Sequence, residues 1–257
     1  MSIPIVITAF GTTTAAREAY SRVEEHMKEV LADHSFYWAY SSRMVRDACR
    51  VGGGEACKGP REVLEDLDRE GHPWAVVQSL HLVCGHEFYR LVEEAREARI
   101  RTSVGMPLLC SPQDYRRFMK ALPETLPSPP DKDEAVVFVG HGTDHPSWVC
   151  YVALQHMFRQ SMGARWLLGV VEGYPSREEV LVDVIQSGAR KVRLVPLMLV
   201  AGRHVREDLL GAGDSWRAAF EREGIPAVVE NRGLLSRSGV VDIFIDHIRD
   251  ALDVIPD

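Results

Sequence analysis

A histidine stands between two glycines directly after a strand-like apolar run, in the segment Gly140-His141-Gly142-Thr143. Glycines on both sides remove steric cover and let the backbone turn sharply, so the imidazole is expected to project from the end of the strand. Such an imidazole can bind a metal or transfer a proton near pH 7. A capping or packing role is the alternative for a single histidine, and the glycine turn favours the ligand role.

A second histidine, His204, follows the apolar run Lys191–Val200. Two imidazoles that converge from neighbouring strand ends can hold a borderline divalent ion such as cobalt, iron, nickel or zinc. Glu172 ends another apolar run and precedes Gly173. A glutamate there is ordinarily a loop or helix-start charge; beside two histidines it can complete a metal site or accept protons from a substrate.

An internal repeat sets the candidate residues in equivalent places. The two halves of the chain share two matching runs: Ile5–Thr12 with Val136–Thr143, and Leu80–Gly85 with Leu197–Gly202. This alignment pairs Phe10 with His141, and Glu87 with His204. One lobe therefore offers an apolar wall where the other offers a ligand. Because ligands of open parallel sheets bind at the carboxyl ends of the strands, both sets are expected to line one cleft between the lobes.

The elements that must position these residues are short apolar strands alternating with amphipathic helices. That alternation predicts an α/β fold of two similar lobes, each a parallel sheet flanked by helices. Four prolines and a charged tail within residues 123–134 indicate a linker. The expected division is therefore an N-terminal lobe over residues 1–125 and a C-terminal lobe over residues 126–257, which carries both histidines.

Composition excludes several classes of partner. The 257 residues are 46% hydrophobic and 26% charged, which is typical of a globular protein with a sizeable core. The net charge of −7 argues against a general affinity for nucleic acid or anionic lipid. No apolar run reaches transmembrane length, so no membrane partner is expected.

The five cysteines are scattered and form no CxxC pair, which predicts reduced thiols without a disulfide framework. The first strand-like run follows no basic segment of a signal peptide. These features predict a cytoplasmic protein, with a periplasmic location as the alternative if an export peptide has been removed.

Other active-site motifs are absent from the sequence. No GxGxxG, GxSxG, HExxH or P-loop pattern occurs. Phosphatases that resemble phosphoglycerate mutase place arginine before the histidine of a comparable motif, and here that position is Gly140. The segment 41–46 can supply hydroxyls and cations to an anionic ligand, with a solvated helix start as the alternative.

The chain resembles the class II tetrapyrrole chelatases, most closely the anaerobic sirohydrochlorin cobaltochelatases of the CbiK type. The resemblance runs through nearly the whole chain and rests on several ungapped motifs: Phe10-Gly11-Thr12, Val77-Gln-Ser-Leu-His81, Gly105-Met-Pro-Leu-Leu109, Gly140-His141-Gly142, Val171-Glu172-Gly173-Tyr174-Pro175, Pro196–Gly202 with His204, and Gly213-Asp-Ser-Trp216. It implies two α/β lobes with the active site between them.

The resemblance also implies roles for individual residues. His141, Glu172 and His204 would bind the metal, and Glu87 would join His141 and Glu172 in catalysis. The substrate would contact a further set: Phe10, Gly11, Thr12, Ser42, Arg43 and His86. One departure is His86 beside Glu87, where the family has a polar residue other than histidine; His86 is an additional potential ligand.

The implied activity is insertion of Co²⁺ into sirohydrochlorin during anaerobic cobalamin biosynthesis. The divalent metal, Co²⁺ or alternatively Fe²⁺, is then a substrate, and no organic cofactor is required. Two alternatives stay open: a sirohydrochlorin ferrochelatase, because imidazole and carboxylate accept both ions, and a non-catalytic metal or haem carrier. Partners are expected to be the tetrapyrrole and, by resemblance alone, further copies of the chain in a homo-oligomer.

Overall fold

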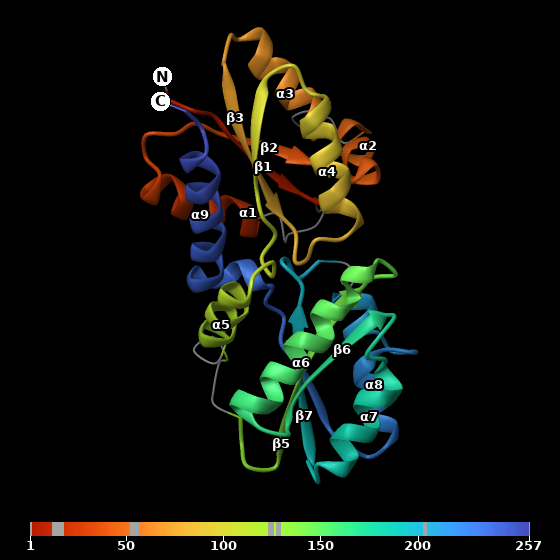
Figure 1. Cartoon of the computed structure of the whole chain (residues 1–257). Helices are drawn as coiled ribbons and strands as arrows, with labels where there is room; N and C mark the ends of the chain where they lie inside the picture. The colour runs from red at the N-terminus through yellow and green to blue at the C-terminus, as the bar shows by residue number, and fades with distance from the viewer. Residues whose placement is uncertain are drawn as a thin grey trace. The chain divides into compact units, whose positions relative to one another are not determined.

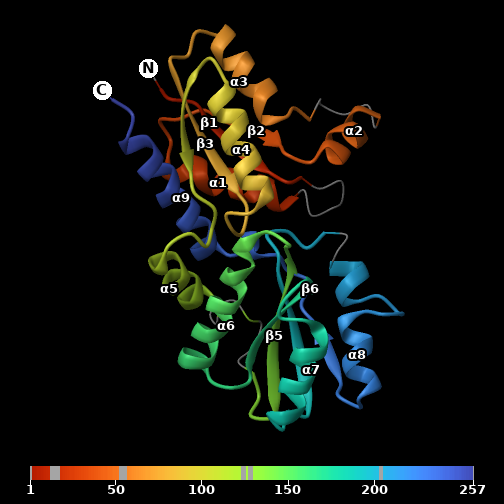
Figure 2. The same ribbon diagram turned by 45° about the vertical axis from the view of Figure 1, so that its right-hand side comes forward.

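The computed structural model describes residues 2–11, 18–51, 57–122, 126, 130–202 and 205–256. The chain divides into two compact units, Met1–Phe118 with Arg237–Asp257, and Met119–Ser236. Each unit holds one four-stranded sheet in which neighbouring strands run parallel (Figure 1, Figure 2). The predicted α/β class with two parallel sheets is therefore confirmed.

The first unit has strand order β2-β1-β3-β4. Its elements are β1 (Ile5–Ala9), α1 (Glu18–Val30), β2 (Phe36–Tyr40), α2 (Arg43–Val51), α3 (Pro60–Arg69), β3 (Trp74–Leu80), α4 (His86–Glu97), β4 (Arg101–Gly105), α5 (Pro112–Ala121), which runs past the boundary at Phe118, and α9 (Ser238–Asp253). Helices α3 and α4 pack together on one face of the sheet, and α1 and α9 pack together on the other (Figure 1).

Helix α9 belongs to the first unit although it ends the chain. Its apolar stripe packs on β3, β4 and α1, and its buried side chains include Phe244 and Ile248. The sequence-based division at residue 125 differs from this grouping, because it assigned all of residues 126–257 to the second lobe. The physical reason is coverage: α3 and α4 share one face of the sheet, so β3 and β4 need another helix on the opposite face.

The second unit has strand order β6-β5-β7-β8. Its elements are β5 (Glu134–Gly142), α6 (Val149–Met162), β6 (Trp166–Glu172), α7 (Arg177–Gln186), β7 (Lys191–Leu197), α8 (Trp216–Arg222) and β8 (Ala227–Val229), with short helical turns at Pro146–Trp148, Val205–Leu209 and Leu234–Ser236. No described helix has the length and apolar character needed to cross a lipid bilayer.

The two sheets repeat one topology, as the internal alignment predicts. β5, β6, β7 and β8 occupy the places of β1, β2, β3 and β4. Their cores combine strand residues with the inward faces of the covering helices: in the first sheet, the fully buried Val6, Ala75 and Val77 pack with Leu64 of α3 and Leu91 of α4. In both sheets the strand order reverses between the first and third strands, β1 and β3 or β5 and β7. Ligands of such sheets bind at this switch point, beyond the carboxyl ends of the strands.

A buried ion pair fixes the opposite, amino-terminal edge of the second sheet. Arg193 donates from Nε to Oε1 of Glu134 at 3.0 Å and from Nη2 to Oε2 at 2.9 Å, and both side chains are at least nine-tenths buried. Glu134 begins β5, and Arg193 lies near the start of the neighbouring strand β7. The bidentate contact therefore holds the starts of the two central strands together.

Glu134→Gln is expected to lower the free energy of unfolding by about 1.5–3 kcal/mol, because it leaves the buried guanidinium without its charged partner. Chemical denaturation followed by tryptophan fluorescence measures this. The matched control is Asp131→Asn, which removes the exposed pair with Lys191 and should change stability little. Equal effects of the two substitutions would contradict the special role of the buried pair.

Candidate functional site

His141 lies at the carboxyl end of β5, and close neighbours require the glycines that flank it. Gly142 has φ +88°, and a Cβ built there would lie 1.8 Å from the backbone oxygen of Glu172. A Cβ on Gly140 would lie 2.8 Å from Cε1 of Tyr151. The His141 side chain is exposed, with Nδ1 3.4 Å from the carbonyl oxygen of Gly142. The sequence prediction of an imidazole presented at a strand end is confirmed.

Glu172 is the last residue of β6, the strand next to β5. Its Cα pairs in register with that of Gly142, so the backbones of the histidine turn and the glutamate meet at one edge of the sheet. The Glu172 side chain is exposed. An imidazole and a carboxylate therefore lie on adjacent strand ends, as expected from the sequence.

His204 lies outside the described residues, between Gly202 and Val205 in the sequence. The strand that precedes it, β7, is the other neighbour of β5. The switch point of the second sheet thus lies between the strand that ends near His141 and the strand that His204 follows.

The candidates in the first unit follow the equivalent strand ends. Phe10 and Gly11 directly follow β1, and the Phe10 side chain is 49% exposed, which suits an apolar wall. Thr12 lies outside the described residues. Ser42 and Arg43 follow β2; Arg43 is largely exposed, whereas Ser42 is buried. The Ser42 Oγ accepts a hydrogen bond from the backbone N–H three residues on, 3.4 Å away, so it caps α2.

His86 and Glu87 form the first turn of α4, which follows β3. His86 is exposed, and the carboxylate of Glu87 forms an ion pair with Arg90 one turn along the helix. Both residues lie at the carboxyl end of β3, where the sequence predicts them. The pairing with Arg90 was not expected.

His81 is a further histidine at this edge; in the sequence it belongs to the motif Val77–His81 and, with His86, leaves room for the carrier alternative. It directly follows β3, and its Nδ1 lies 2.8 Å from the Oγ of Ser79. Its Nε2 is buried and has no hydrogen-bond partner among the described residues. Burial lowers the pKa of His81 to about 4, against a smaller opposing effect of the Glu87 charge. The ring is therefore neutral near pH 7.

The free energy of unfolding should decrease as the pH falls from about 6.5 to about 4. In this range His81 becomes protonated in the unfolded chain but stays neutral in the folded protein. The expected contribution is up to about 1.4 kcal/mol per pH unit. His81→Gln should flatten the pH dependence of the unfolding free energy over this range, and His156→Gln, an exposed control, should not. An unchanged slope in His81→Gln would contradict the neutral, buried ring.

Exposed apolar side chains follow strand ends in each of the two units, a feature that the sequence did not predict. The large exposed side chains that follow β1, β2, β4, β5 and β6 are Phe10, Met44, Met106, Trp148 and Tyr174. Trp148 and Tyr174 pack edge to face with ring centroids 5.9 Å apart. Their exposure distinguishes them from core residues, and exposure was not available from sequence. The exposed pair of Trp148 and Tyr174 is an apolar patch at the carboxyl edge of the second sheet, and such a patch marks a place for a ligand or partner.

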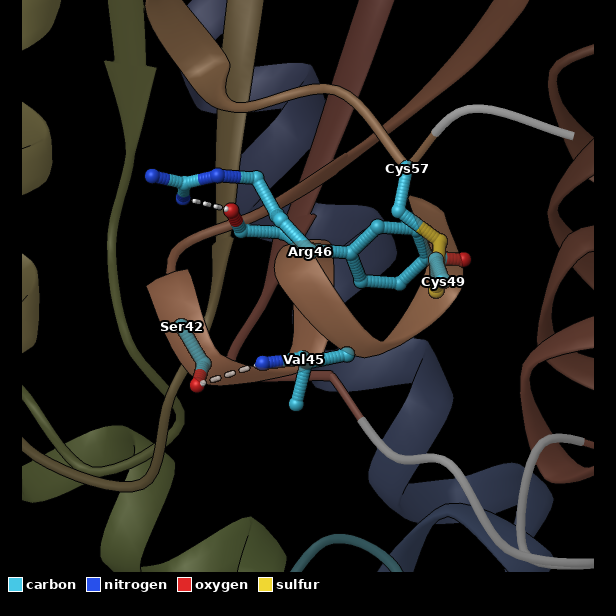
Figure 3. Close-up of a disulfide and its surroundings, with 6 residues drawn as sticks. Ser42, Val45, Arg46, Cys49 and Cys57 are labelled. Atoms are coloured by element: carbon cyan, nitrogen blue, oxygen red, sulfur yellow. Dashed lines mark hydrogen bonds between the residues drawn. A yellow bond between two sulfur atoms is a disulfide. The ribbon is translucent and has the colours of Figure 1, made fainter. Parts of the chain in front are cut away.

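A disulfide joins Cys49 of α2 to Cys57, which precedes α3 (Figure 3). The expectation of reduced thiols is therefore wrong for these two cysteines, whose Cα atoms lie 5.9 Å apart. Sequence spacing alone could not show this approach. Arg46 of the same helix donates to the carbonyl oxygens of Tyr40 and Ser41, at 2.6 and 3.0 Å. Its guanidinium thus binds the backbone after β2 and is engaged within the protein.

The described geometry defines a class of fold: two parallel α/β units with imidazole and carboxylate groups at their strand ends. A solved structure with this fold is SirB from Bacillus subtilis with Fe³⁺, with a TM-score of 0.66 and 15% identity over 98% of this chain and 96% of SirB. At this identity the similarity establishes the chelatase-like fold.

Sequence comparisons identify the family. The model of the cobalt chelatase family (CbiK) matches residues 4–253. The sirohydrochlorin cobaltochelatase of Salmonella typhimurium is 32% identical over 99% of this chain and 98% of its own length. The sirohydrochlorin cobaltochelatase CbiKC of Nitratidesulfovibrio vulgaris is 32% identical over 98% of this chain and 92% of its own length. The chain belongs to the cobalt chelatase (CbiK) family, which confirms the resemblance seen in its motifs.

Proposed function

We propose that this protein is a sirohydrochlorin cobaltochelatase, which inserts Co²⁺ into sirohydrochlorin for cobalamin biosynthesis. The observation that carries the proposal is the register of β5 and β6, which sets the His141 turn beside Glu172 in a chain of the cobalt chelatase family. Family relatives that carry this name match over nearly their whole length.

Metal insertion exchanges two pyrrole N–H protons for one divalent ion. In the proposed mechanism, His141, His204 and Glu172 hold the ion, because neutral imidazole and carboxylate suit cobalt and ferrous iron. His141, Glu172 and Glu87 are the candidate proton acceptors. The two protons leave the ring as the two new metal–nitrogen bonds replace the N–H bonds, so the macrocycle gains the ion without a change in net charge. No organic cofactor takes part in these steps.

The exposed aromatic side chains are candidate contacts for the macrocycle. The edge-to-face pair of Trp148 and Tyr174 follows the strands that carry His141 and Glu172, and Phe10 follows the equivalent strand of the first unit. Aromatic side chains bind flat conjugated rings by stacking. Arg43, largely exposed, is a candidate partner for the carboxylates at the rim of the substrate.

Anaerobic absorbance spectroscopy with sirohydrochlorin tests the proposal, with Co²⁺ and Fe²⁺ in parallel. The wild-type protein should convert many equivalents of substrate to the metallated spectrum, and the double variant His141→Ala, His204→Ala should not. Faster turnover with Fe²⁺ would replace the proposal by a ferrochelatase. Tight binding of the metallated product without turnover would replace it by a carrier.

The cysteines test the proposed cytoplasmic location. The non-disulfide cysteines in the described residues are Cys84, Cys110 and Cys150. Purified, denatured protein should therefore present three reactive thiols, and five after reduction. Trapping of thiols in intact cells separates the compartments: reduced Cys49 and Cys57 would support the cytoplasm, and a disulfide already present would support the periplasmic alternative. The homo-oligomer expected by resemblance is tested by sedimentation of the same sample.

A further inference from the structure

Three groups that can bind metal meet within the first unit, at the start of α5 and the inner side of α9. They are Cys110, Asp114 and His247, whose ligand atoms all lie within 4.8 Å of one another. The Asp114 and His247 side chains are each 7% exposed, and Cys110 is partly buried. Helix α5 lies next to one end of α9 in both views (Figure 1, Figure 2). None of the three residues has a role in the proposed chelatase site.

The hydrogen bonds of this cluster fix where its protons are. The Nδ1 of His247 lies 3.0 Å from the carbonyl oxygen of Met106, which only accepts, so Nδ1 carries a hydrogen. Oδ2 of Asp114 accepts from the backbone N–H and the hydroxyl of Ser111 and from the thiol of Cys110, at 2.9, 2.7 and 3.1 Å. Three donors on one oxygen describe an ionised carboxylate.

The remaining contact then requires a positive charge. Nε2 of His247 lies 3.2 Å from Oδ1 of Asp114. With Nδ1 protonated, a neutral imidazole would present its lone pair to a carboxylate oxygen, which also only accepts. Two such atoms approach this closely when a proton or a metal ion lies between them. The cluster therefore holds either an imidazolium or a bound cation.

We propose that Cys110, Asp114 and His247 bind one divalent transition-metal ion, such as Zn²⁺ or Co²⁺. The ion forms bonds to Sγ, a carboxylate oxygen and Nε2, and it displaces the thiol proton and the Nε2 proton. The net charge of the cluster is zero before binding, from one carboxylate and one imidazolium. It is zero afterwards, from one carboxylate, one thiolate and the ion, so two protons leave for each ion bound.

The geometry agrees with a tetrahedral ion. Zinc bond lengths to sulfur, nitrogen and oxygen place ligand atoms roughly 3.3–3.6 Å apart in a tetrahedral site. In the structure Nε2 lies 3.2 Å from Oδ1 and 3.9 Å from the Sγ of Cys110. The bond from Nδ1 to the carbonyl of Met106 is the outer contact that metal-binding histidines usually make. Only small shifts would therefore complete the site.

A mixed sulfur, nitrogen and oxygen donor set selects borderline ions rather than magnesium or calcium. In the absence of an ion, burial and the hydrogen bond to Asp114 raise the pKa of the Cys110 thiol, and the nearby Cys84 adds to this. A coordinated ion removes a thiol proton outright, so this pKa does not prevent binding. The bound ion would join α5 to the helix that ends the chain, and so stabilise α9 on the first sheet.

Cobalt spectroscopy of metal-free, full-length protein tests the proposal. Anaerobic titration with Co²⁺ should produce a near-ultraviolet charge-transfer band from thiolate to cobalt, with about two protons released per ion. Because His141, Glu172 and His204 contain no sulfur, cobalt bound by those residues gives no such band. Cys110→Ser should remove the band and weaken cobalt binding at this site at least about tenfold.

Two matched variants and a second readout complete the experiment. Cys84→Ser and Cys150→Ser should keep the band, and Zn²⁺ should raise the melting temperature of wild type more than that of Cys110→Ser, because only wild type has this cluster in addition to the proposed site of His141, Glu172 and His204. Serine retains a hydroxyl donor toward Asp114, so the hydrogen-bonded cluster survives in that variant. Absence of the band from wild type, or its persistence in Cys110→Ser, would show that Cys110 does not bind the ion and would overturn the proposal.

Discussion

Replacing His141 with alanine should lower the rate of Co²⁺ insertion by roughly 10²–10⁴-fold while the protein stays folded. The side chain is exposed at the end of β5, so its loss creates no cavity in the core. What is lost is the imidazole that we propose to bind the ion and to accept a proton from the substrate. Steady-state anaerobic assays at saturating sirohydrochlorin measure the rate, and circular dichroism measures the fold.

The control for this variant is His156→Ala, which removes another exposed histidine of the second unit from the middle of α6. It should insert the metal at the wild-type rate. His141→Ala should also bind Co²⁺ more weakly at the proposed site of His141, Glu172 and His204. Weaker binding would show that His141 is a ligand of the ion and does not only position other groups. Full activity in His141→Ala would refute its assignment and would direct attention to His204 and Glu172.

The sequence predicts the fold well because parallel strands covered on both faces are continuous apolar runs. Val136–Val139 is an example: four consecutive apolar residues before a glycine are typical of a strand covered on both faces, and these residues are completely or almost completely buried. The internal repeat then predicts that both sheets share one strand order. The packing of α9 was not predictable, since an amphipathic stripe shows that a helix is half-buried but not which sheet it covers.

The sequence predicts those features of the candidate site that depend on the backbone, such as glycine turns and strand ends. It does not predict the features that depend on contacts between side chains. The glycines around His141 and the end of a strand at Glu172 are visible as residue types. The capping bond of Ser42 and the ion pair of Glu87 with Arg90 depend on rotamers, which sequence spacing does not determine. The approach of Cys49 to Cys57 likewise depends on the three-dimensional packing of α2, and it contradicts the prediction that all five cysteines are reduced.

Gly142 has no side chain, and this lets the ends of β5 and β6 pair closely at Gly142 and Glu172. Gly142→Ala should lower the unfolding free energy by about 3 kcal/mol or more and slow metal insertion roughly 10²-fold. A methyl group 1.8 Å from the backbone oxygen of Glu172 must push the two strand ends apart. The two proposed ligands, His141 and Glu172, would then lie farther apart.

The matched control is Gly163→Ala at the end of α6. Gly163 has φ +98°, close to the +88° of Gly142, but a Cβ there meets nothing within 4 Å. Its substitution therefore costs only the strain of a backbone conformation that glycine alone adopts readily, with φ +98° and ψ 176°, about 1–3 kcal/mol, and should leave the insertion rate unchanged. Denaturation curves and insertion rates of the two variants thus separate backbone strain from the steric conflict with Glu172. If both variants lost stability equally and kept full activity, the strand ends would tolerate displacement, and the close pairing of Gly142 with Glu172 would not be what positions the metal-binding groups.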